Sequence, residues 1–415
     1  MAAGAQIIDD LLRPDVNADP HQALARLREL DSIHWSEPHR AWLATRYNDI
    51  SEAYRNRALS SDRVRPLLAM SKDENEQSAA TTRVRELLSQ WMVVSDPPQH
   101  TRLRRLAAGA FKQQRIVDMN QRIQQLVDDL LDQFIAEGHT DLIEHLAYPL
   151  PAIVIAEMLG APQEDRDRFR HWSDELALVA FGAGGDAREE RHERALRGME
   201  EMVAFFRELI ELRRREPGDD MLTAMMAGDG SGDELTEDEL VAMCALLLFA
   251  GHETTTNSIA NGIVALLQHP DQLALLREEP DLISSAVEEL LRFDGPIKVI
   301  NRWVTQDTEL AGQQIRAGER VYLVLSAANR DSAKFTDPDA LDLRRSPNPH
   351  IAFGKGIHAC LGAQLARLET RIAIGSVVRR LPGLRLAGEL SYKESLAARA
   401  LRRLPVAHDA QPTHR

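Results

Sequence analysis

The chain has 415 residues, of which 44% are hydrophobic and 27% charged, and its formal net charge is -14. This composition suits a globular protein with a large core, and the excess of acids argues against nucleic acid as the main partner. Two cysteines in so long a chain exclude a disulfide framework and favour a reducing compartment, so we expect a cytoplasmic protein.

We expect neither a signal peptide nor a membrane span. The first 20 residues carry acids and a proline instead of a basic segment followed by an apolar one. The longest apolar run, 241–251, is about half as long as a membrane-spanning helix.

Helical periodicity dominates the sequence. In chain order, the predicted elements are a strand at 41–45, helices at 120–138, 236–268 and 281–296, a strand at 298–304, a hairpin within 309–321 and a strand at 320–327. Many helices, with a few strands towards the two ends of the chain, predict an α+β fold that is mostly α.

The long helix predicted at 236–268 is apolar on all sides. Thr236 and Glu239 form a capping-box pattern at its start. A helix that is hydrophobic all round is expected to be buried. Its centre nevertheless reads AGHETT over 250–255, and polar side chains are costly to bury unless they have partners or a function.

Cys360 lies in the segment FGKGIHACLG, immediately before a helical pattern. Glycines at 354, 356 and 362 allow backbone conformations that are closed to other residues, and a turn that ends at a helix start points N–H groups inward. Such donors stabilise an anion, and the thiolate of Cys360 would be a metal ligand. The alternative is a buried structural cysteine beside a glycine turn.

Zinc is a poor candidate for that metal. A zinc site needs three or four protein ligands, commonly in close pairs, and no second cysteine lies near Cys360 in the sequence. One thiolate is enough where a macrocycle supplies the other ligands, as haem does. We therefore interpret Cys360 as the axial ligand of a haem iron, with Phe353 packed beside the sulfur.

The spacing of this segment resembles the haem-binding signature of the cytochrome P-450 superfamily. The matching residues are Phe353, Gly354, Gly356, His358, Cys360 and Gly362. The resemblance extends from about residue 35 to 401–406. It implies a single domain over 1–415, with a long buried helix over haem b and small β-sheets. We expect the ends, about 1–20 and 408–415, to be loosely ordered.

The AGHETT segment resembles the oxygen-activating motif of that family. Ala250 and Gly251 are small enough to leave room above a haem, and the resemblance makes Ala250 a haem contact. Glu253 and Thr254 would be the catalytic pair that delivers protons. A water-filled kink without chemistry is the alternative for this segment when it is taken alone.

Glu289 and Arg292 are three residues apart and therefore share a helix face, where they can form an ion pair. In the family, the corresponding pair joins a second arginine in a buried triad that fixes the cysteine loop. Arg345 stands at the matching place, and its neighbour Arg344 is the alternative.

Four basic residues match the family's donors to the haem propionates. They are His100, Arg104, Arg302 and His358. Propionates are anions, and charge-assisted hydrogen bonds from such side chains would hold them in place.

The resemblance implies a haem-thiolate monooxygenase that inserts one oxygen atom from O2 into a mainly apolar small molecule, in a reaction that we associate with secondary metabolism. Electrons would come from an external ferredoxin and an NAD(P)H-dependent ferredoxin reductase. The alternatives are another oxidation by the same fold, such as ring coupling or peroxide-driven chemistry, and a non-enzymatic haem-based sensor. The Glu253–Thr254 pair favours the monooxygenase.

A basic patch is the expected docking surface for the ferredoxin. Its proposed members are Arg102, Arg105, Lys112, Lys355 and Arg367, and ordinary surface charge is the alternative.

Two further residues receive structural interpretations. We expect Cys244 to be a small core residue, and we expect Lys298 to reach solvent rather than to pair with a substrate anion.

Overall fold

The computed structural model describes residues 9–70, 78–111, 113–162, 165–180 and 188–411. Contacts divide the chain into two compact units. The first unit contains residues 1–59, 118–151 and 254–415, and the second contains residues 60–117 and 152–253.

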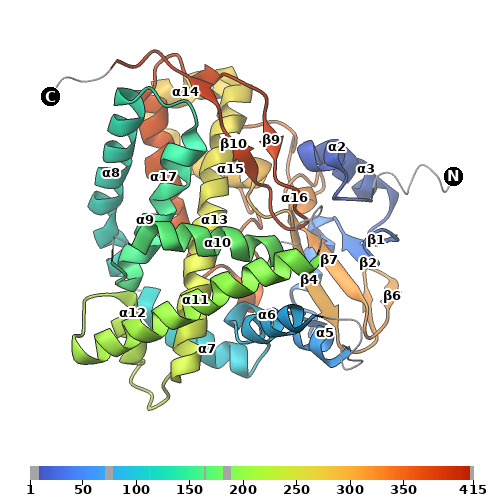
Figure 1. The fold of residues 1–415 in the computed structure, drawn as a ribbon. Coiled ribbons are helices and arrows are strands. Elements are labelled where there is room, and N and C mark those ends of the chain that lie inside the picture. The colour runs from blue at the N-terminus through green and yellow to red at the C-terminus, as the bar shows by residue number, and fades with distance from the viewer. Residues whose placement is uncertain (1–8, 71–77, 112, 163–164, 181–187, 412–415) are drawn as a thin grey trace. The chain divides into compact units, whose positions relative to one another are not determined.

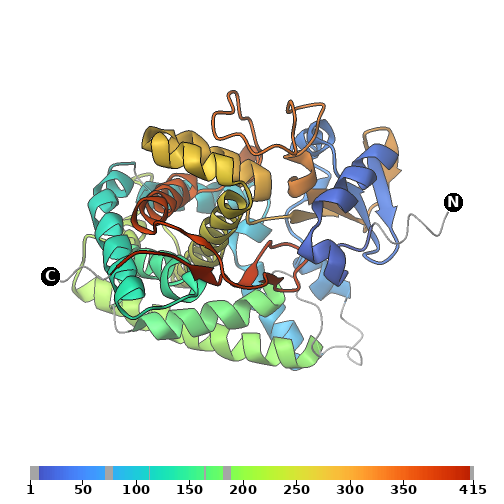
Figure 2. The same ribbon diagram turned by 90° about the horizontal axis from the view of Figure 1, so that it is seen from above.

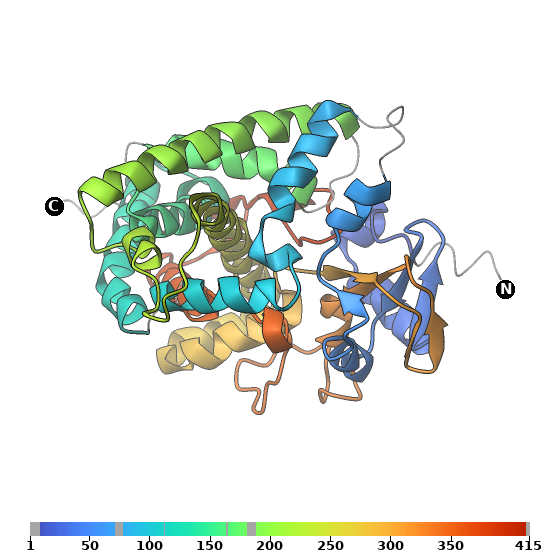
Figure 3. The same ribbon diagram turned by 90° about the horizontal axis from the view of Figure 1, so that it is seen from below.

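Helices build the second unit. Those that lie wholly within it are α5 (Arg65–Met70), α6 (Ala79–Ser89), η1 (Met92–Val94), α7 (Gln99–Ala108), η2 (Gly109–Phe111), α10 (Arg166–Ala180), α11 (Arg188–Arg215) and α12 (Met221–Met226). Figure 3 shows α11 lying along α10 and in contact with α6. The rings of Phe169 and Trp172 on α10 pack against Phe205 on α11, with centroids 5.2 and 5.5 Å away, so aromatic burial joins these two helices.

Three helices belong partly to each unit. They are α8 (Gln113–Ala136), α9 (Pro149–Leu159) and α13 (Glu237–Gln268). The capping box of α13 is present, because Thr236 Oγ1 accepts from the Glu239 N–H at 3.3 Å and Glu239 Oε2 accepts from the Thr236 N–H at 2.9 Å. Every residue from Leu240 to Phe249 is buried, which confirms the prediction of a buried helix. No helix among the described residues is both long and apolar enough to cross a membrane.

The first unit contains the remaining helices. They are α2 (Pro14–Ala18), α3 (His21–Leu30), α4 (Tyr47–Ala53), η3 (Ile143–Ala147), α14 (Pro270–Glu278), η5 (Pro280–Leu282), α15 (Ile283–Asp294), α16 (Leu325–Ala328), η6 (Gly356–His358) and α17 (Ala363–Arg380). Helices α14 and α15 both pack on α17 (Figure 2).

The main sheet has five strands in the order β1-β2-β7-β4-β3 (Figure 1). The strands are β1 (Ile33–Ser36), β2 (Ala41–Ala44), β3 (Leu59–Ser60), β4 (Val299–Val304) and β7 (Arg320–Val324). The register is parallel between β2 and β7, with Trp42 opposite Val321, and antiparallel between β4 and β7, with Asn301 opposite Tyr322. Two-stranded sheets pair β5 (Thr308–Leu310) with β6 (Gln313–Ile315), β8 (Arg385–Leu386) with β11 (Val406–Ala407), and β9 (Ser391–Tyr392) with β10 (Leu401–Arg403).

Alternating side chains of β7 enter two different cores, as expected for a strand that is buried on both faces. Val321 and Leu323 pack with Ile50 of α4. Tyr322 and Val324 pack in a second cluster with Leu24 and Leu27 of α3. Helices therefore cover both faces of this strand.

The mainly helical α+β prediction is confirmed, although some boundaries differ. The strand predicted at 320–327 ends at Val324, where α16 begins, and the helix predicted at 120–138 already starts at Gln113. No sequence pattern predicted β1, β3 or the paired strands β8 to β11, most of which are only two or three residues long.

The expectation of loosely ordered ends is wrong for their inner parts. Residues 1–8 and 412–415 lie outside the described residues. Leu11 and Val16, however, are buried, and the amide of Asn17 donates to the Lys393 carbonyl at 3.0 Å. Near the other end, the Asp409 N–H donates to the Pro382 carbonyl at 2.8 Å.

Candidate functional site

The Cys360 loop folds back on itself within the first unit. The Cys360 N–H donates to the Phe353 carbonyl at 2.9 Å, and the Ala359 N–H donates to the Gly356 carbonyl at 3.1 Å. Gly354 and Gly356 have φ of 70° and 71°, the left-handed region that glycine adopts without strain. The loop ends at Gly362, the N-cap of α17, so Cys360 precedes a helix N-terminus that favours negative charge.

Cys360 is exposed, whereas Cys244 on α13 is buried. The core role predicted for Cys244 is therefore confirmed. Burial raises the pKa of the Cys244 thiol, with a smaller contribution from Asp220. Cys244 therefore keeps its proton, and the accessible sulfur belongs to Cys360.

Neighbouring side chains hold this loop from two directions. A Cβ at Gly354 would lie 3.4 Å from the Tyr54 hydroxyl oxygen, so the loop passes close to that ring. The Arg367 guanidinium lies 4.4 Å from the centre of the Phe353 ring. Arg367 also donates from Nε to Glu288 Oε1 at 2.6 Å, and this pair fixes the guanidinium over the ring.

Glu288 on α15 contacts residues on both sides of the Cys360 loop, His350 before it and Arg367 after it. Burial raises its pKa, but hydrogen bonds from His350 and Arg367 outweigh this effect and lower it to about 2. The His350 ring nitrogen lies 3.1 Å from Glu288 Oε2. Sequence reasoning missed Glu288 and His350 as loop supports, because neither shows a local pattern that reveals its distant partner.

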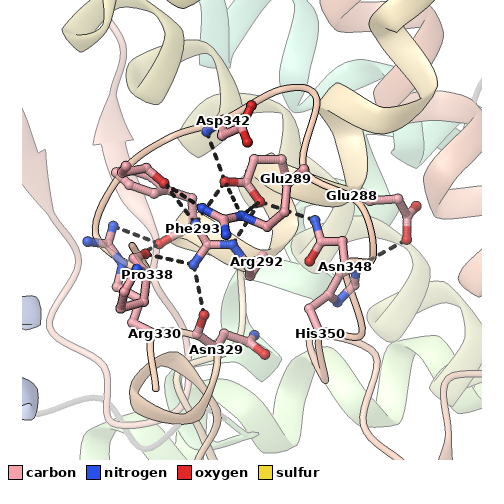
Figure 4. A network of polar contacts seen from close by, with 12 residues as sticks. Glu288, Glu289, Arg292, Phe293, Asn329, Arg330, Pro338, Asp342, Asn348 and His350 are labelled. Carbon is pink, nitrogen blue, oxygen red and sulfur yellow. Dashed lines mark hydrogen bonds and ion pairs between the residues drawn. The ribbon is translucent and has the colours of Figure 1, made fainter. Parts of the chain in front are cut away.

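A buried network lies beside the loop and contains the predicted triad (Figure 4). Arg292 donates to both carboxylate oxygens of Glu289, at 2.7 and 2.8 Å. Nε of Arg345 lies 3.1 Å from each of the same two oxygens. Arg344 instead pairs with Glu279, so the structure selects Arg345 as the second arginine.

Further donors complete the coordination of Glu289. The Asp342 N–H and the Asn348 side-chain amide donate to it, at 3.0 and 3.1 Å. Arg292 also donates to the Asn329 carbonyl at 2.9 Å, while the Asn329 side-chain oxygen accepts from the Ile351 N–H at 2.8 Å. The network therefore binds the segment that leads directly into the Cys360 loop.

The AGHETT segment lies within the unbroken helix α13. Ala250 is exposed although the ten residues before it are buried, and Thr254 is partly exposed. His252 and Glu253 are buried, at 1% and 2% exposure. Along this segment the small Ala250 is therefore exposed, whereas the acid Glu253 is buried.

Gly251 allows a close helix contact within the second unit. A Cβ at this position would lie 3.2 Å from Cγ1 of Ile155 on α9. A larger residue would push α9 away from α13 at the level of Ala250.

His100 and Arg104 lie on α7 in the second unit. His100 is 1% exposed, and its pKa is lowered by burial and by the neighbouring Arg104 charge, against a smaller opposing effect of Asp96. A buried imidazole beside an arginine is a neutral hydrogen-bonding group at neutral pH.

Arg302 and His358 belong to the first unit, with Cys360. Arg302 on β4 is 5% exposed, and its guanidinium lies 5.7 Å from the centre of the Tyr54 ring. Burial raises the pKa of Tyr54 to about 12, although Arg302 opposes this shift. Tyr54 touches both the loop and Arg302, and it is a site residue that sequence reasoning missed.

The expected basic patch is largely neutralised by neighbouring acids. Arg102 pairs with Asp233 and Glu239, at 2.9 and 2.7 Å, and Arg105 pairs with Asp229 and Asp233. Lys112 lies outside the described residues.

In the first unit Arg367 pairs with Glu288, whereas Lys355 keeps its charge and lies 5.6 Å from the Tyr47 ring centre. The expectation for Lys298 is wrong: it is 4% exposed and donates to the Asn17 side chain at 2.7 Å.

Comparisons with known proteins show which family this chain resembles over most of its length. The family model "Cytochrome P450" matches residues 64–382. Cytochrome P450 CYP107DY1 of Priestia megaterium is 41% identical over 96% of this chain and 98% of its own length. The vitamin D(3) 25-hydroxylase of Pseudonocardia autotrophica is 43% identical over 94% of this chain and 93% of its own length.

Solved structures are similar over nearly the whole chain. The crystal structure of P450BioI with an acyl carrier protein that carries hexadec-9Z-enoic acid has a TM-score of 0.87 and 38% identity, and covers 95% of this chain and 100% of that one. The match of a family model to more than half of the sequence, together with these full-length relatives, shows that the chain belongs to the cytochrome P-450 family and is a haem-dependent monooxygenase.

Proposed function

We propose that Cys360 provides the axial thiolate of a haem b, and that the enzyme inserts one oxygen atom from O2 into a mainly apolar small molecule. The observation that carries the proposal is the position of Cys360, at the end of a loop closed by its own N–H bond to Phe353 and directly before the N-terminus of α17. When bound, the haem supplies the iron at which O2 is activated.

The residues around Cys360 fit such a group. Phe353, Gly354 and Gly362 form the loop that would lie against the haem on the cysteine side. The Phe353 ring, held by Arg367, would limit access of water to the sulfur. The exposed Ala250 has a small side chain that would leave space beside a flat macrocycle.

Four basic side chains would bind the two propionates: His100, Arg104, Arg302 and His358. The burial of His100 and Arg302 supports this role, because charge-assisted hydrogen bonds are strongest where water is excluded.

Glu253 and Thr254 would carry protons to the reacting oxygen. Thr254 is partly exposed, and its carbonyl accepts from the Ser258 hydroxyl at 2.9 Å. Glu253 is the adjacent buried acid and would pass protons inward to the Thr254 hydroxyl. The presence of this pair favours a monooxygenase over a peroxide-driven enzyme.

The substrate class rests on composition and on the named relatives. One relative is a vitamin D(3) hydroxylase, and a structural neighbour holds a hexadecenoyl chain, so both names specify largely apolar molecules. Lys298, bound to Asn17 within the first unit, is engaged and offers no cation to a substrate. We propose a ferredoxin and its NAD(P)H-dependent reductase as the electron donors.

The two cysteines provide a matched test. We expect the reduced, carbon monoxide-treated wild type to show the long-wavelength Soret band of thiolate-ligated haem. Cys360→Ser should abolish this band, and Cys244→Ala should retain it, because the second thiol is buried in the core. The proposal fails if Cys360→Ser keeps the thiolate spectrum.

A further inference from the structure

A cavity of about 530 Å³ lies within the first unit, among α8, α14, η5, α15 and α17. This volume falls within the range of about 300–1,000 Å³ that is usual for small-molecule sites. Helices α14 and α17 lie side by side, and α8 joins α17 through a hydrogen bond from Gln124 to Ser376 at 3.2 Å (Figures 1 and 2).

The cavity is separate from the cysteine loop. Its lining residues on α17 begin at Arg371 and end at Arg379, nine and seventeen residues beyond Gly362. At 1.5 Å per helical residue, they lie roughly 13 to 25 Å further along the helix axis. A ligand held there would not touch Cys360.

Three arginines line the cavity, and no acidic residue does: Arg277, Arg371 and Arg379. Within the described part of the chain, none of the three pairs with a carboxylate. Arg277 donates only to the Leu381 carbonyl and Arg379 only to the Ser376 hydroxyl, both at 3.4 Å, which is a long distance for a hydrogen bond.

The next residue along α17 gives the contrast. Arg380 pairs with Asp128 at 3.1 Å and also with Asp132. The chain has a net charge of -14, and Glu278, Glu279 and Asp281 follow Arg277 closely in the sequence, but none of these acids lines the cavity. The cavity therefore concentrates positive charge without an internal counter-ion.

The other walls are apolar. They include Leu276, Ile283, Ile372 and Val378. Ser376 is 1% exposed and accepts from Gln124, so these two lining residues add a hydroxyl and an amide to the wall. Apolar walls with a few placed charges are typical of sites for amphiphilic molecules.

We propose that this cavity binds an amphiphilic organic anion, a molecule with one oxyanion head and an apolar body such as an acyl chain. The arginines would bind a carboxylate or phosphate ester through paired N–H groups, and the apolar walls would cover the chain. This binding site is additional to the haem and its substrate.

Two substitutions test charge and shape separately. Arg371→Ala removes one cation that has no partner among the described residues, so it should not disturb folding. Gly375→Met fills the cavity without altering charge, since a Cβ there would lie 3.6 Å from Cγ1 of Ile283, an ordinary contact. Arg26→Ala removes an exposed arginine of α3 and serves as the control.

The haem-loaded protein would be titrated calorimetrically with dodecanoate, dodecyl phosphate, dodecanol and inorganic phosphate, while the Soret band reports entry into the haem pocket. We expect dodecanoate or dodecyl phosphate to bind in a step that leaves the Soret band unchanged. Arg371→Ala and Gly375→Met should each weaken that step by about tenfold or more, and Arg26→Ala should not. The tighter of the two anions identifies the head group.

Several results would overturn the proposal. One is binding only with a Soret change; another is equal affinity in Arg371→Ala and the wild type. Dodecanol binding as tightly as the anions would show that charge is not recognised. Inorganic phosphate binding as tightly as dodecyl phosphate would show that the apolar walls contribute nothing.

Discussion

Two glutamates of the first unit are almost completely buried, and their surroundings differ. Glu289 on α15 is 0% exposed and receives hydrogen bonds from Arg292, Arg345 and two amide groups. Glu369 on α17 is 1% exposed, its Oε2 has no hydrogen-bond partner among the described residues, and burial raises its pKa well above the ordinary value. Both carboxyl groups are buried to nearly the same degree, so they differ in the hydrogen-bond donors that surround them.

The difference has a structural meaning. A buried acid with several donors can hold distant segments of chain together, as Glu289 does for α15 and the stretch before Cys360. A buried acid without them is best accommodated as the neutral, protonated form. Glu289 therefore acts as a connector between segments of the chain. The burial of Glu369 instead destabilises the folded protein near neutral pH.

Removing Arg292 should have the largest effect of these tests. Arg292→Ala leaves the buried Glu289 without its bidentate partner, and breaking such a pair costs about 3–5 kcal/mol in the free energy of unfolding. Urea unfolding would measure it. Should this variant fail to fold, Arg292→Lys keeps the charge but loses the paired geometry and should still be clearly destabilised. A loss below about 1 kcal/mol in both variants would contradict the connector role.

Adjacent arginines offer a smaller and better matched test. Arg345→Ala removes a donor to the buried Glu289, which should cost about 1.5–3 kcal/mol. Arg344→Ala breaks only an exposed pair with Glu279, which should cost about 0–1 kcal/mol. Thermal unfolding of both variants would compare them, and equal losses would show that Arg345 is not part of the network.

This contrast also shows how far the sequence could predict the site. The Cys360 loop, the AGHETT segment and the Glu289–Arg292 pair each lie within a short stretch whose spacing indicates its chemistry. Arg345 was predicted from the family resemblance, which places a second arginine upstream of the cysteine loop. Local spacing carries this information because the interacting atoms belong to one turn or one helix.

Contacts between distant segments could not be predicted in the same way. Tyr54 reaches the loop from some 300 residues away, and its helix has no pattern that signals this contact. The acids that neutralise Arg102 and Arg105 lie about 125 to 135 residues further along the chain, so the expected basic patch could not be tested against them. Such pairings arise only when the backbone has folded.

Glu369→Gln should give the smallest change in stability near pH 4, and at higher pH its sign is opposite to that of the arginine variants. Burial raises the folded-state pKa of Glu369 well above its ordinary value of 4.5, so between these two pKa values the unfolded chain loses a proton that the folded chain keeps. Wild-type stability therefore falls as pH rises from about 4.5, by at most about 1.4 kcal/mol per pH unit for this one group.

Glutamine is neutral and similar in shape, so the variant should match the wild type near pH 4 and become progressively more stable than it at higher pH. Unfolding midpoints measured from pH 4 to 8 would test this. A constant difference across that range would mean that Glu369 is ionised in the folded protein and has donors of its own, and the contrast with Glu289 would then disappear.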